Sequence, residues 1–267
     1  MINTPLKYAI RSKIKDFVLS EKKKIKQAHI NDYEILVPVD EGIGWLIYYL
    51  KNFNKKETKY IRSIAKKDWI CFDIGANIGY YSLLFASLHK EIEVHSFEPI
   101  PLCYHLLNSS ILLNDFSNIR LNNFALSNYN GISEFSISKK CESSSFIHTE
   151  MSPLEKRIQV EVRRLDDYIR ENDIERIDFM KIDVEGAEKL VLEGSLETLS
   201  NKELQPKILL VELYDPNFIH YNTSIDEIVT FLNSYGYEAF IILKEQLVPF
   251  TTKHYNDIYN VFFIKKI

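Results

Sequence analysis

The chain has few of the residues that mark a disulfide-rich, metal-binding or linker-divided protein. It holds three cysteines, eight glycines and eight prolines in 267 residues. Cys71, Cys103 and Cys141 lie far apart, with no CxxC pair and no histidine at metal-ligand spacing. We therefore expect reduced thiols and exclude a disulfide framework or a cysteine zinc site. No internal repeat, low-complexity tract or Gly/Pro-rich linker interrupts the sequence, which favours one large domain.

Long apolar runs are missing as well. No stretch of about 18 apolar residues is present to span a bilayer, and the N-terminus lacks the compact apolar segment of a secretory signal. The composition, 46% hydrophobic and 13% aromatic, is sufficient for one large α/β core. We expect a soluble protein of the cytoplasm. Nucleic acid is not expected as a partner, because the body of the chain is acidic and has no RNA-binding motif.

Charge is unevenly distributed along the chain. The formal net charge is −4, yet the first 30 residues carry a net +6 and the remainder −10. Apolar residues recur in this basic segment at intervals of mostly three, four or seven, namely Leu6, Ile10, Ile14, Phe17, Val18 and Ile25. The spacing predicts a basic amphipathic helix. Such a helix packs on the main domain with a solvated lysine face, or it contacts an anionic membrane surface or an acidic partner.

From residue 69 onward, short apolar runs alternate with helical stretches. The predicted strands are WICFDI, IEVHSFE, IRLNNFAL, IDFMKIDV, KILLVELY, YEAFIIL and IYNVFFIK. Continuous apolar strands separated by amphipathic helices predict a parallel sheet covered on both faces. The last two strands have no long helix between them, so we expect an antiparallel hairpin at one edge. Upstream, residues 33–39 are expected to form a strand, and residues 45–50 a strand or a helical turn.

Residues 69–79, WICFDIGANIG, place a glycine-containing loop between the first strand and its helix. Ligands of open parallel sheets bind beyond the carboxyl ends of the strands, where chain order reverses. Gly75 and Gly79 permit a sharp turn, and we expect them to let the backbone approach a ligand at contact distance. Asn77 stands where a dinucleotide fingerprint needs a glycine, and no GK[ST] follows. The loop therefore suits a nucleoside without phosphates, although a packing role for the glycines is the alternative.

Two further strand ends complete the predicted nucleoside site. Glu98 ends the next strand, where a carboxylate accepts hydrogen bonds from both hydroxyls of a ribose; the alternatives are a solvated residue or a helix cap. The run NNFALS follows the third strand, and Phe124 and Leu126 are expected to hold an adenine, unless the run is a plain strand exit. The predicted cofactor-binding residues are Asp73, Gly75, Ala76, Asn77, Gly79, Glu98, Pro99, Phe124, Ala125 and Asp183.

Six segments occur in order between residues 69 and 267: FDIGANIGYYSLLFA, FEPIPLCYHLL, NNFALSNYNG, RLDDY, DFMKIDVEGAE and LLVEL. Together they resemble the FkbM family of S-adenosylmethionine-dependent methyltransferases, and KIDVEGAE is the most specific part. The resemblance implies a Rossmann-like class I methyltransferase fold, α/β with a seven-stranded, mostly parallel sheet and an antiparallel C-terminal hairpin. It also implies S-adenosyl-L-methionine as methyl donor, S-adenosyl-L-homocysteine as product, and O-methylation of an alcohol, often on a sugar or a natural product. We divide the chain into an N-terminal extension of helix and short strands, residues 1–66, expected to shape the acceptor site, and a methyltransferase domain, residues 67–267.

An alcohol is a poor nucleophile while protonated, so this chemistry needs a general base or a metal. The ends of the fourth and fifth strands supply candidates. Alternation places Lys181, Asp183 and Glu185 on one side if the strand stays extended. We favour Asp183 and Glu212 for acceptor contact and proton removal, because two close carboxylates raise one pKa. Lys181 is a further catalytic candidate.

Several alternatives stay open at these strand ends. Lys181 can instead pair with one of the acids, Glu185 can cap the following helix, and Glu188 is expected to face solvent. His148, in the polar loop SSSFIHTE, is a candidate base on a lid, or simply an exposed histidine. A carboxylate cluster can hold a divalent cation, but no dedicated metal spacing is present, so we expect no metal site.

Two rival functions compete with methyl transfer. One is a nucleoside-binding scaffold without turnover, acting in a glycan or natural-product assembly. The acids at the fourth and fifth strand ends argue against it. The other is an NAD-dependent oxidoreductase, which Asn77 disfavours because it replaces the glycine that approaches the pyrophosphate.

Overall fold

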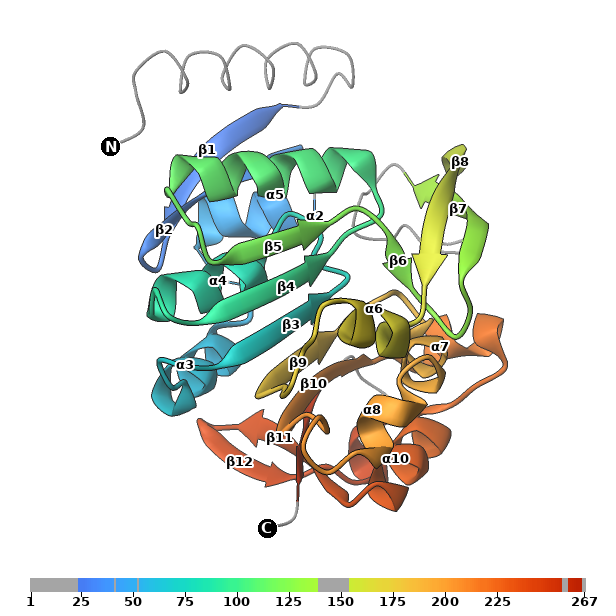
Figure 1. Cartoon of the computed structure of the whole chain (residues 1–267). Coiled ribbons are helices and arrows are strands. Elements are labelled where there is room, and N and C mark those ends of the chain that lie inside the picture. The colour runs from blue at the N-terminus through green and yellow to red at the C-terminus, as the bar shows by residue number, and fades with distance from the viewer. Residues whose placement is uncertain (1–23, 41, 52, 139–153, 256–258, 266–267) are drawn as a thin grey trace.

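The computed structural model of the chain is built around one eight-stranded sheet, with two smaller sheets beside it (Figure 1). It describes residues 24–40, 42–51, 53–138, 154–255 and 259–265. The strand order is β12-β11-β13-β10-β9-β3-β4-β5. The strands are β3 (Ile70–Ile74), β4 (Glu93–Phe97), β5 (Ile119–Asn122), β9 (Phe179–Ile182), β10 (Ile208–Leu213), β11 (Tyr237–Leu243), β12 (Gln246–Pro249) and β13 (Tyr259–Lys265). Neighbours from β5 to β10 are parallel, and β13 runs antiparallel to both β10 and β11.

This order confirms the expected α/β architecture with a mostly parallel sheet and an antiparallel C-terminal hairpin. The strand count differs, because β12 adds an eighth strand within a segment expected to be a connection. β11 and β12 are joined through Lys244 and Glu245, whose φ values of 48° and 65° are both positive. Positive φ at both central residues is the geometry of a type I′ hairpin turn, which usually contains Asn or Gly. Since neither is present here, the turn gave no sequence signal.

Helices cover both faces of the large sheet (Figure 1). On one face, α4 (Tyr80–Leu88) and α5 (Pro101–Leu113) pack in a core shared with the N-terminal strands. Pro101 is the first residue of α5, where its missing N–H costs nothing. The second core contains residues of α6 (Leu165–Glu171), α7 (Glu188–Glu193), α8 (Leu196–Ser200), α9 (Asp215–Phe218) and α10 (Ile225–Ser234). The short 3-10 helices are η3 (Ile219–Tyr221) and η4 (Thr252–His254).

The N-terminal segment differs from its prediction. Residues 25–30, assigned to the basic helix, instead form β1 (Ile25–Ile30), which pairs with β2 (Tyr33–Pro38) around a tight turn at Asn31, φ 51°. Cross-strand pairing has overridden the helical spacing. Residues 1–23 lie outside the described residues, so the helix there stays a prediction. The helical alternative for residues 45–50 is confirmed, because α2 (Gly42–Trp45) continues into the π-helix η1 (Leu46–Leu50), ahead of α3 (Lys55–Ile64).

The β1–β2 hairpin is fixed to α5 by side chains. The backbone N–H of Leu36 donates to Ser110 Oγ at 3.0 Å, and the N–H of Glu34 donates to Asn114 Oδ1 at 2.7 Å. Asn114 Nδ2 in turn donates to the Glu34 carbonyl oxygen at 2.7 Å. These bonds satisfy backbone groups along the open edge of β2, which would otherwise be costly to bury.

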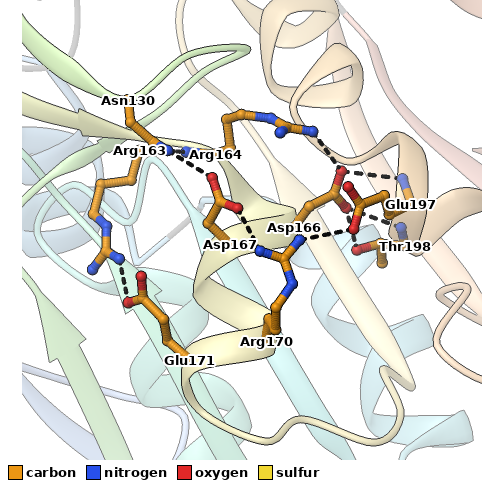
Figure 2. A network of polar contacts seen from close by, with 9 residues as sticks. All are labelled: Asn130, Arg163, Arg164, Asp166, Asp167, Arg170, Glu171, Glu197 and Thr198. Atoms are coloured by element: carbon orange, nitrogen blue, oxygen red, sulfur yellow. Dashed lines mark hydrogen bonds and ion pairs between the residues drawn. The ribbon is translucent and has the colours of Figure 1, made fainter.

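A three-stranded sheet of β6 (Ala125–Leu126), β8 (Leu154–Arg163) and β7 (Gly131–Ser138) stands beside the main one. Figure 2 shows the polar network that joins it to α6 and α8. Asp166, which is 3% exposed, accepts hydrogen bonds from the backbone N–H groups of Glu197 and Thr198 at 3.1 and 2.9 Å. The Arg164 guanidinium lies 3.2 Å from the same carboxylate. The network therefore joins the end of β8 and the start of α6 to α8.

Cys71 and Cys103 are buried free thiols, as expected, and burial raises the pKa of Cys71. Cys141 lies outside the described residues. Within the described parts of the chain, no helix combines the length and the apolar character needed to cross a bilayer.

Candidate active site

A cavity of about 510 Å³ opens at the carboxyl ends of the parallel strands. β3 lies between β4 and β9, so chain order reverses beside it, as at ligand sites of other open α/β sheets. Two parts of its wall differ in origin. The loop half is lined by Gly75, Ala76, Asn77, Glu98, Pro99, Ile100, Ala125, Leu126 and Phe135. The acidic half is lined by Phe53, Asn54, Lys56, Glu57, Tyr81, Lys181, Asp183, Glu185, Glu212 and Asn260.

The turn between β3 and α4 is bonded to the end of β4. The backbone N–H groups of Gly75 and Ala76 both donate to the Phe97 carbonyl oxygen, at 3.1 and 3.0 Å. Gly75 and Gly79 have φ values of 78° and 94°, which glycine adopts without strain. The sharp turn predicted from the two glycines is confirmed.

Close packing within the protein is one reason for the two glycines, and the approach of a ligand to this backbone stays a prediction. A Cβ on Gly75 would lie 1.9 Å from the Asp183 carbonyl oxygen, and a Cβ on Gly79 would lie 2.2 Å from Cδ1 of Leu107. Both distances are far below van der Waals contact. The atoms that exclude a side chain therefore belong to the protein, at the end of β9 and on α5, and the packing alternative accounts for both glycines.

Glu98 follows β4 and is 4% exposed. Its carboxylate accepts hydrogen bonds from the backbone N–H groups of Asn77 and Ile100, both at 2.7 Å. These bonds tie the β3–α4 turn to the start of α5 and fix the carboxylate at the cavity wall. Glu98 is therefore neither solvated nor the N-cap of α5, which is Ile100, and binding of ribose hydroxyls stays a prediction.

Two predicted residues of this half, Gly79 and Phe124, do not line the cavity. The Phe124 ring packs with its centroid 5.6 Å from that of Phe97 and 6.0 Å from that of Tyr168. Its predicted contact with an adenine is therefore not supported, whereas Leu126 does reach the cavity. Sequence reasoning missed Ile100, which directly follows Pro99. It also missed Phe135, because the sequence of β7 gave no sign of which strand it joins.

Asp73 and Lys181 are register partners on β3 and β9, and both line the cavity. Asp73 is 1% exposed and accepts a hydrogen bond from Ser82 Oγ at 2.5 Å. Burial raises the pKa of Asp73, and the nearby Lys181 ammonium only partly offsets that rise. The pair places one buried negative and one buried positive group where the two halves meet.

Lys181 is 2% exposed, and its Nζ donates to Asp183 Oδ2 at 2.5 Å. Burial lowers the pKa of Lys181, but the carboxylates of Asp183, Asp73 and Glu212 raise it by more, so the pKa lies above its ordinary value. The ammonium therefore keeps its proton at neutral pH, and the ion-pair alternative is confirmed. Lys181 is bonded to Asp183, and its catalytic role stays a prediction.

Asp183 and Glu212 come together as predicted. β9 and β10 are parallel with Ile182 opposite Val211, so the next residue of each strand lies side by side. Burial raises the pKa of Glu212 well above its ordinary value, and the charges of Asp183 and Glu185 raise it further. Glu212 can consequently take up a proton at a pH where an exposed glutamate cannot.

Glu185 joins this pair by a turn rather than by strand alternation. β9 ends at Ile182, and positive φ at Glu185 and Gly186, 56° and 104°, reverses the chain. Oxygens of Asp183, Glu185 and Glu212 lie within 4.8 Å of one another. Such a cluster is able to share a divalent cation, but three close acids do not by themselves define a metal site.

The prediction that Glu188 faces solvent is wrong. Glu188 is 1% exposed, and it accepts a hydrogen bond from the backbone N–H of Val184 at 2.9 Å. Its Oε2 is buried without a hydrogen-bond partner among the described residues. Burial raises the pKa of Glu188 to about 7.

Part of the acidic half is formed by residues 53–57, which precede the strands of the large sheet in the sequence. No individual site residue was predicted in this segment. Two consecutive tyrosines at the start of α4 bind this segment. Tyr80 Oη donates to the Phe53 carbonyl oxygen at 2.7 Å, and Asn54 Nδ2 donates to Tyr81 Oη at 3.0 Å. The two consecutive tyrosines after the glycine loop were the only sequence feature that could have pointed to a segment bound at this place.

Asn260 of β13 was also missed, and it lies opposite Glu212 in the β10–β13 register. Its Oδ1 is buried and has no hydrogen-bond partner among the described residues. His148 lies outside the described residues, so its role as a base stays a prediction.

Comparison with known proteins agrees with this geometry. A family described as "Methyltransferase FkbM domain" matches residues 73–239. That range begins on β3 and ends in β11, and it includes the acids at the ends of β9 and β10.

Three curated relatives are similar to the chain. Methyltransferase sdnD of Sordaria araneosa is 30% identical over 176 residues, 55% of this chain and 67% of that protein. The 2-O-methyltransferase NoeI of Sinorhizobium fredii (strain NBRC 101917 / NGR234) is 30% identical over 160 residues, 55% of this chain and 65% of that protein. The 31-O-demethyl-FK506 methyltransferase FkbM of Streptomyces tacrolimicus is 26% identical over 206 residues, 66% of this chain and 74% of that protein. The matches thus span about two thirds of the length of the first two relatives.

Proposed function

This chain belongs to the family of methyltransferase FkbM domains, and on that premise we propose that it methylates a hydroxyl group of a sugar, glycan or natural product. The family makes it an S-adenosylmethionine-dependent methyltransferase. The hydroxyl acceptor is our proposal, and the names of two relatives, a 2-O-methyltransferase and a 31-O-demethyl-FK506 methyltransferase, support it. S-adenosylhomocysteine is the expected product.

The loop half is proposed to bind the nucleoside part of the cofactor. When bound, S-adenosylmethionine supplies a methyl group activated by its sulfonium charge. An ionised carboxylate has about four acceptor sites, so the bonds that Glu98 accepts from Asn77 and Ile100 are compatible with further bonds to ribose hydroxyls. Ala125 and Leu126 provide an apolar wall against which the adenine ring can lie.

The acidic half is proposed to bind and deprotonate the acceptor. The observation that carries this proposal is the close pair of Asp183 and Glu212 in the same cavity as the glycine loop. Glu212 removes the hydroxyl proton, because its raised pKa suits a base that works near neutral pH. Asp183, fixed by Lys181, accepts a hydrogen bond that orients the hydroxyl. Alignment of two reactants can contribute about 7 kcal/mol or more to lowering the barrier.

The division into residues 1–66 and 67–267 is part of the same proposal. Phe53, Asn54, Lys56 and Glu57 line the acidic half and lie ahead of the large sheet. Their position supports an N-terminal extension that shapes the acceptor site.

The test combines binding with turnover. Titration calorimetry measures the Kd of S-adenosylhomocysteine and of NAD for the wild type, Asp183→Asn and Glu212→Gln. Methyl transfer from labelled S-adenosylmethionine is screened against sugars and glycans. We expect S-adenosylhomocysteine but not NAD to bind all three proteins, and Glu212→Gln to lower turnover by about 10²–10⁴-fold.

Each failure has a distinct meaning. Absence of S-adenosylhomocysteine binding contradicts the cofactor assignment, and NAD binding in its place favours the oxidoreductase. Cofactor binding with no methylation of any hydroxyl favours the scaffold without turnover. Full activity of Glu212→Gln removes Glu212 from the role of base.

A further inference from the structure

The acidic half presents more negative than positive groups to whatever enters it. Its carboxylates belong to Glu57, Asp183, Glu185 and Glu212. Its ammonium groups belong to Lys181, which is bonded to Asp183 at 2.5 Å, and to Lys56, which is exposed. One buried positive charge therefore faces several carboxylates.

Glu57 is the acid of this group that stands apart from the catalytic cluster. It lies in the first turn of α3, it is half-buried, and it lines the cavity. Burial raises its pKa, and the Lys56 charge only partly offsets that rise. No hydrogen bond from another described residue reaches its carboxylate. A half-buried carboxylate in a cavity is stabilised when a ligand donates a proton to it.

Asn260 gives a second, independent sign of the same kind. Its buried Oδ1 has no hydrogen-bond partner in the described part of the chain, and the residue lines the cavity opposite Glu212. An unpaired buried acceptor costs stability unless a ligand or water donates to it. The carboxylate of Glu57, which has only its own backbone N–H as a donor among the described residues, and the Oδ1 of Asn260 can therefore both accept hydrogen bonds from a ligand.

We propose that the acceptor is a polyhydroxylated or amine-bearing compound with no phosphate, sulfate or carboxylate near its reacting hydroxyl, and that Glu57 selects it. This inference rests on the proposed function, since it names the class of acceptor for the same site. Hydroxyl and ammonium groups can donate protons to Glu57 and Asn260, whereas a carboxylate, a sulfate or a doubly ionised phosphate has none to donate.

An anionic group in this half would be excluded by charge. It would lie among Glu57, Glu185 and Glu212, and like charges across an interface are strongly unfavourable where water is displaced. It would also favour protonation of Glu212, which removes the base. Sugars that carry a pyrophosphate next to the reacting hydroxyl are therefore poor acceptors.

The experiment uses the full chain saturated with S-adenosylhomocysteine and matched sugar probes. In the gluco, galacto and manno series, each methyl hexoside is compared with its 2-amino derivative and its 6-phosphate, by calorimetry and by saturation-transfer NMR in EDTA. We expect the neutral or amino probe of at least one series to bind about 10-fold or more tightly than the phosphate. Glu57→Gln should reduce that ratio and Glu57→Lys should invert it. Glu175→Gln, a change at an exposed glutamate that does not line the cavity, should leave it unchanged.

A phosphate probe that binds as tightly as its neutral parent overturns the proposal, and so does the absence of binding by every neutral and amino probe. A ratio that does not change in Glu57→Gln and Glu57→Lys removes Glu57 as the selecting residue. These failures differ from failure of the proposed function, because S-adenosylhomocysteine binding is measured first on the same samples.

Discussion

The two halves of the cavity are built in different ways. The loop half comes mainly from the turns that follow β3 and β4, and backbone N–H groups bonded to Phe97 O and Glu98 hold it. The acidic half is assembled from five separated parts of the chain, namely residues 53–57, α4 and the ends of β9, β10 and β13. Its interior is held by charge, through Lys181 and the acids around it.

A different physical term therefore controls each half of the cavity. Backbone geometry and close packing fix the loop half, so it is sensitive to one added carbon atom. Charge balance fixes the acidic half, so it is sensitive to one removed charge. The two halves touch where Gly75 packs on the carbonyl oxygen of Asp183.

Removal of the buried ammonium is expected to have the largest effect. Lys181→Met leaves Asp73 and Asp183 without the buried ammonium group between them, and loss of one member of a buried ion pair costs about 3–5 kcal/mol. We expect a drop of about 3 kcal/mol or more in the free energy of unfolding, measured by urea denaturation.

Lys189→Met is the matched control for that change. Lys189 Nζ lies 2.6 Å from Glu227 Oε2, but the side chains are 33% and 50% exposed. Surface pairs contribute about 1 kcal/mol or less, so the control should unfold nearly as the wild type does. Equal losses in the two variants would show that the acidic half does not depend on buried charge.

Gly75→Ala tests the loop half. A Cβ there meets the Asp183 carbonyl oxygen at 1.9 Å, and φ is 78°. Overpacking and left-handed backbone together cost about 3 kcal/mol. Gly236→Ala has φ 88° and no atom within 4 Å of the added Cβ, so it isolates the backbone cost of about 1 kcal/mol. Similar unfolding free energies for the two variants would contradict close packing at Gly75.

The loop half was largely predictable from sequence because it is local. A strand, two glycines and a helix lie within residues 69–90, and an acid at the end of the next strand follows from the same pattern. The reason for the glycines was not predictable, because the Asp183 carbonyl oxygen and Leu107 are far away in sequence. The position of Phe124 outside the cavity lining was not predictable, because it depends on β6 pairing with β8 in a separate sheet.

The acidic half was predictable only where strand ends carry it. Asp183 and Glu212 follow two adjacent parallel strands, so their proximity could be expected. Glu57 and Asn260 are brought to the cavity by tertiary contacts that no local sequence pattern encodes. Glu185 is brought there by a turn with positive φ. Glu188 was misjudged because its position at a helix start does not reveal that the neighbouring elements bury it.

The buried acid beside this half should make stability depend on pH. The pKa of Glu188 is raised to about 7, so the folded state binds its proton more tightly than the unfolded state does. The stabilisation is complete below the ordinary glutamate pKa and is lost as pH rises toward 7. Glu188→Gln mimics the protonated form, so its free energy of unfolding should exceed that of the wild type by about 3 kcal/mol at pH 8 and nearly equal it at pH 4.5. A constant difference between the variants from pH 4.5 to 8, measured by urea denaturation, would contradict this assignment.

The smallest expected effect is that of Tyr81→Phe, which should weaken acceptor binding without changing cofactor binding. Tyr81→Phe keeps the ring beside Lys181 but removes the hydroxyl that accepts the hydrogen bond from Asn54 Nδ2. Loss of one such bond costs about 1 kcal/mol, which corresponds to a rise of about 3–10-fold in the acceptor KM if the segment at 53–57 positions the acceptor. The Kd of S-adenosylhomocysteine and kcat should stay within about twofold, because the loop half has no bond to this hydroxyl.

Tyr168→Phe is the control, since it removes a buried hydroxyl bonded to His95 outside the cavity, at a similar cost in stability and with no change in KM. A changed Kd of S-adenosylhomocysteine with an unchanged acceptor KM would contradict this prediction. It would show that Tyr81 acts on the cofactor site and that the two halves do not function separately.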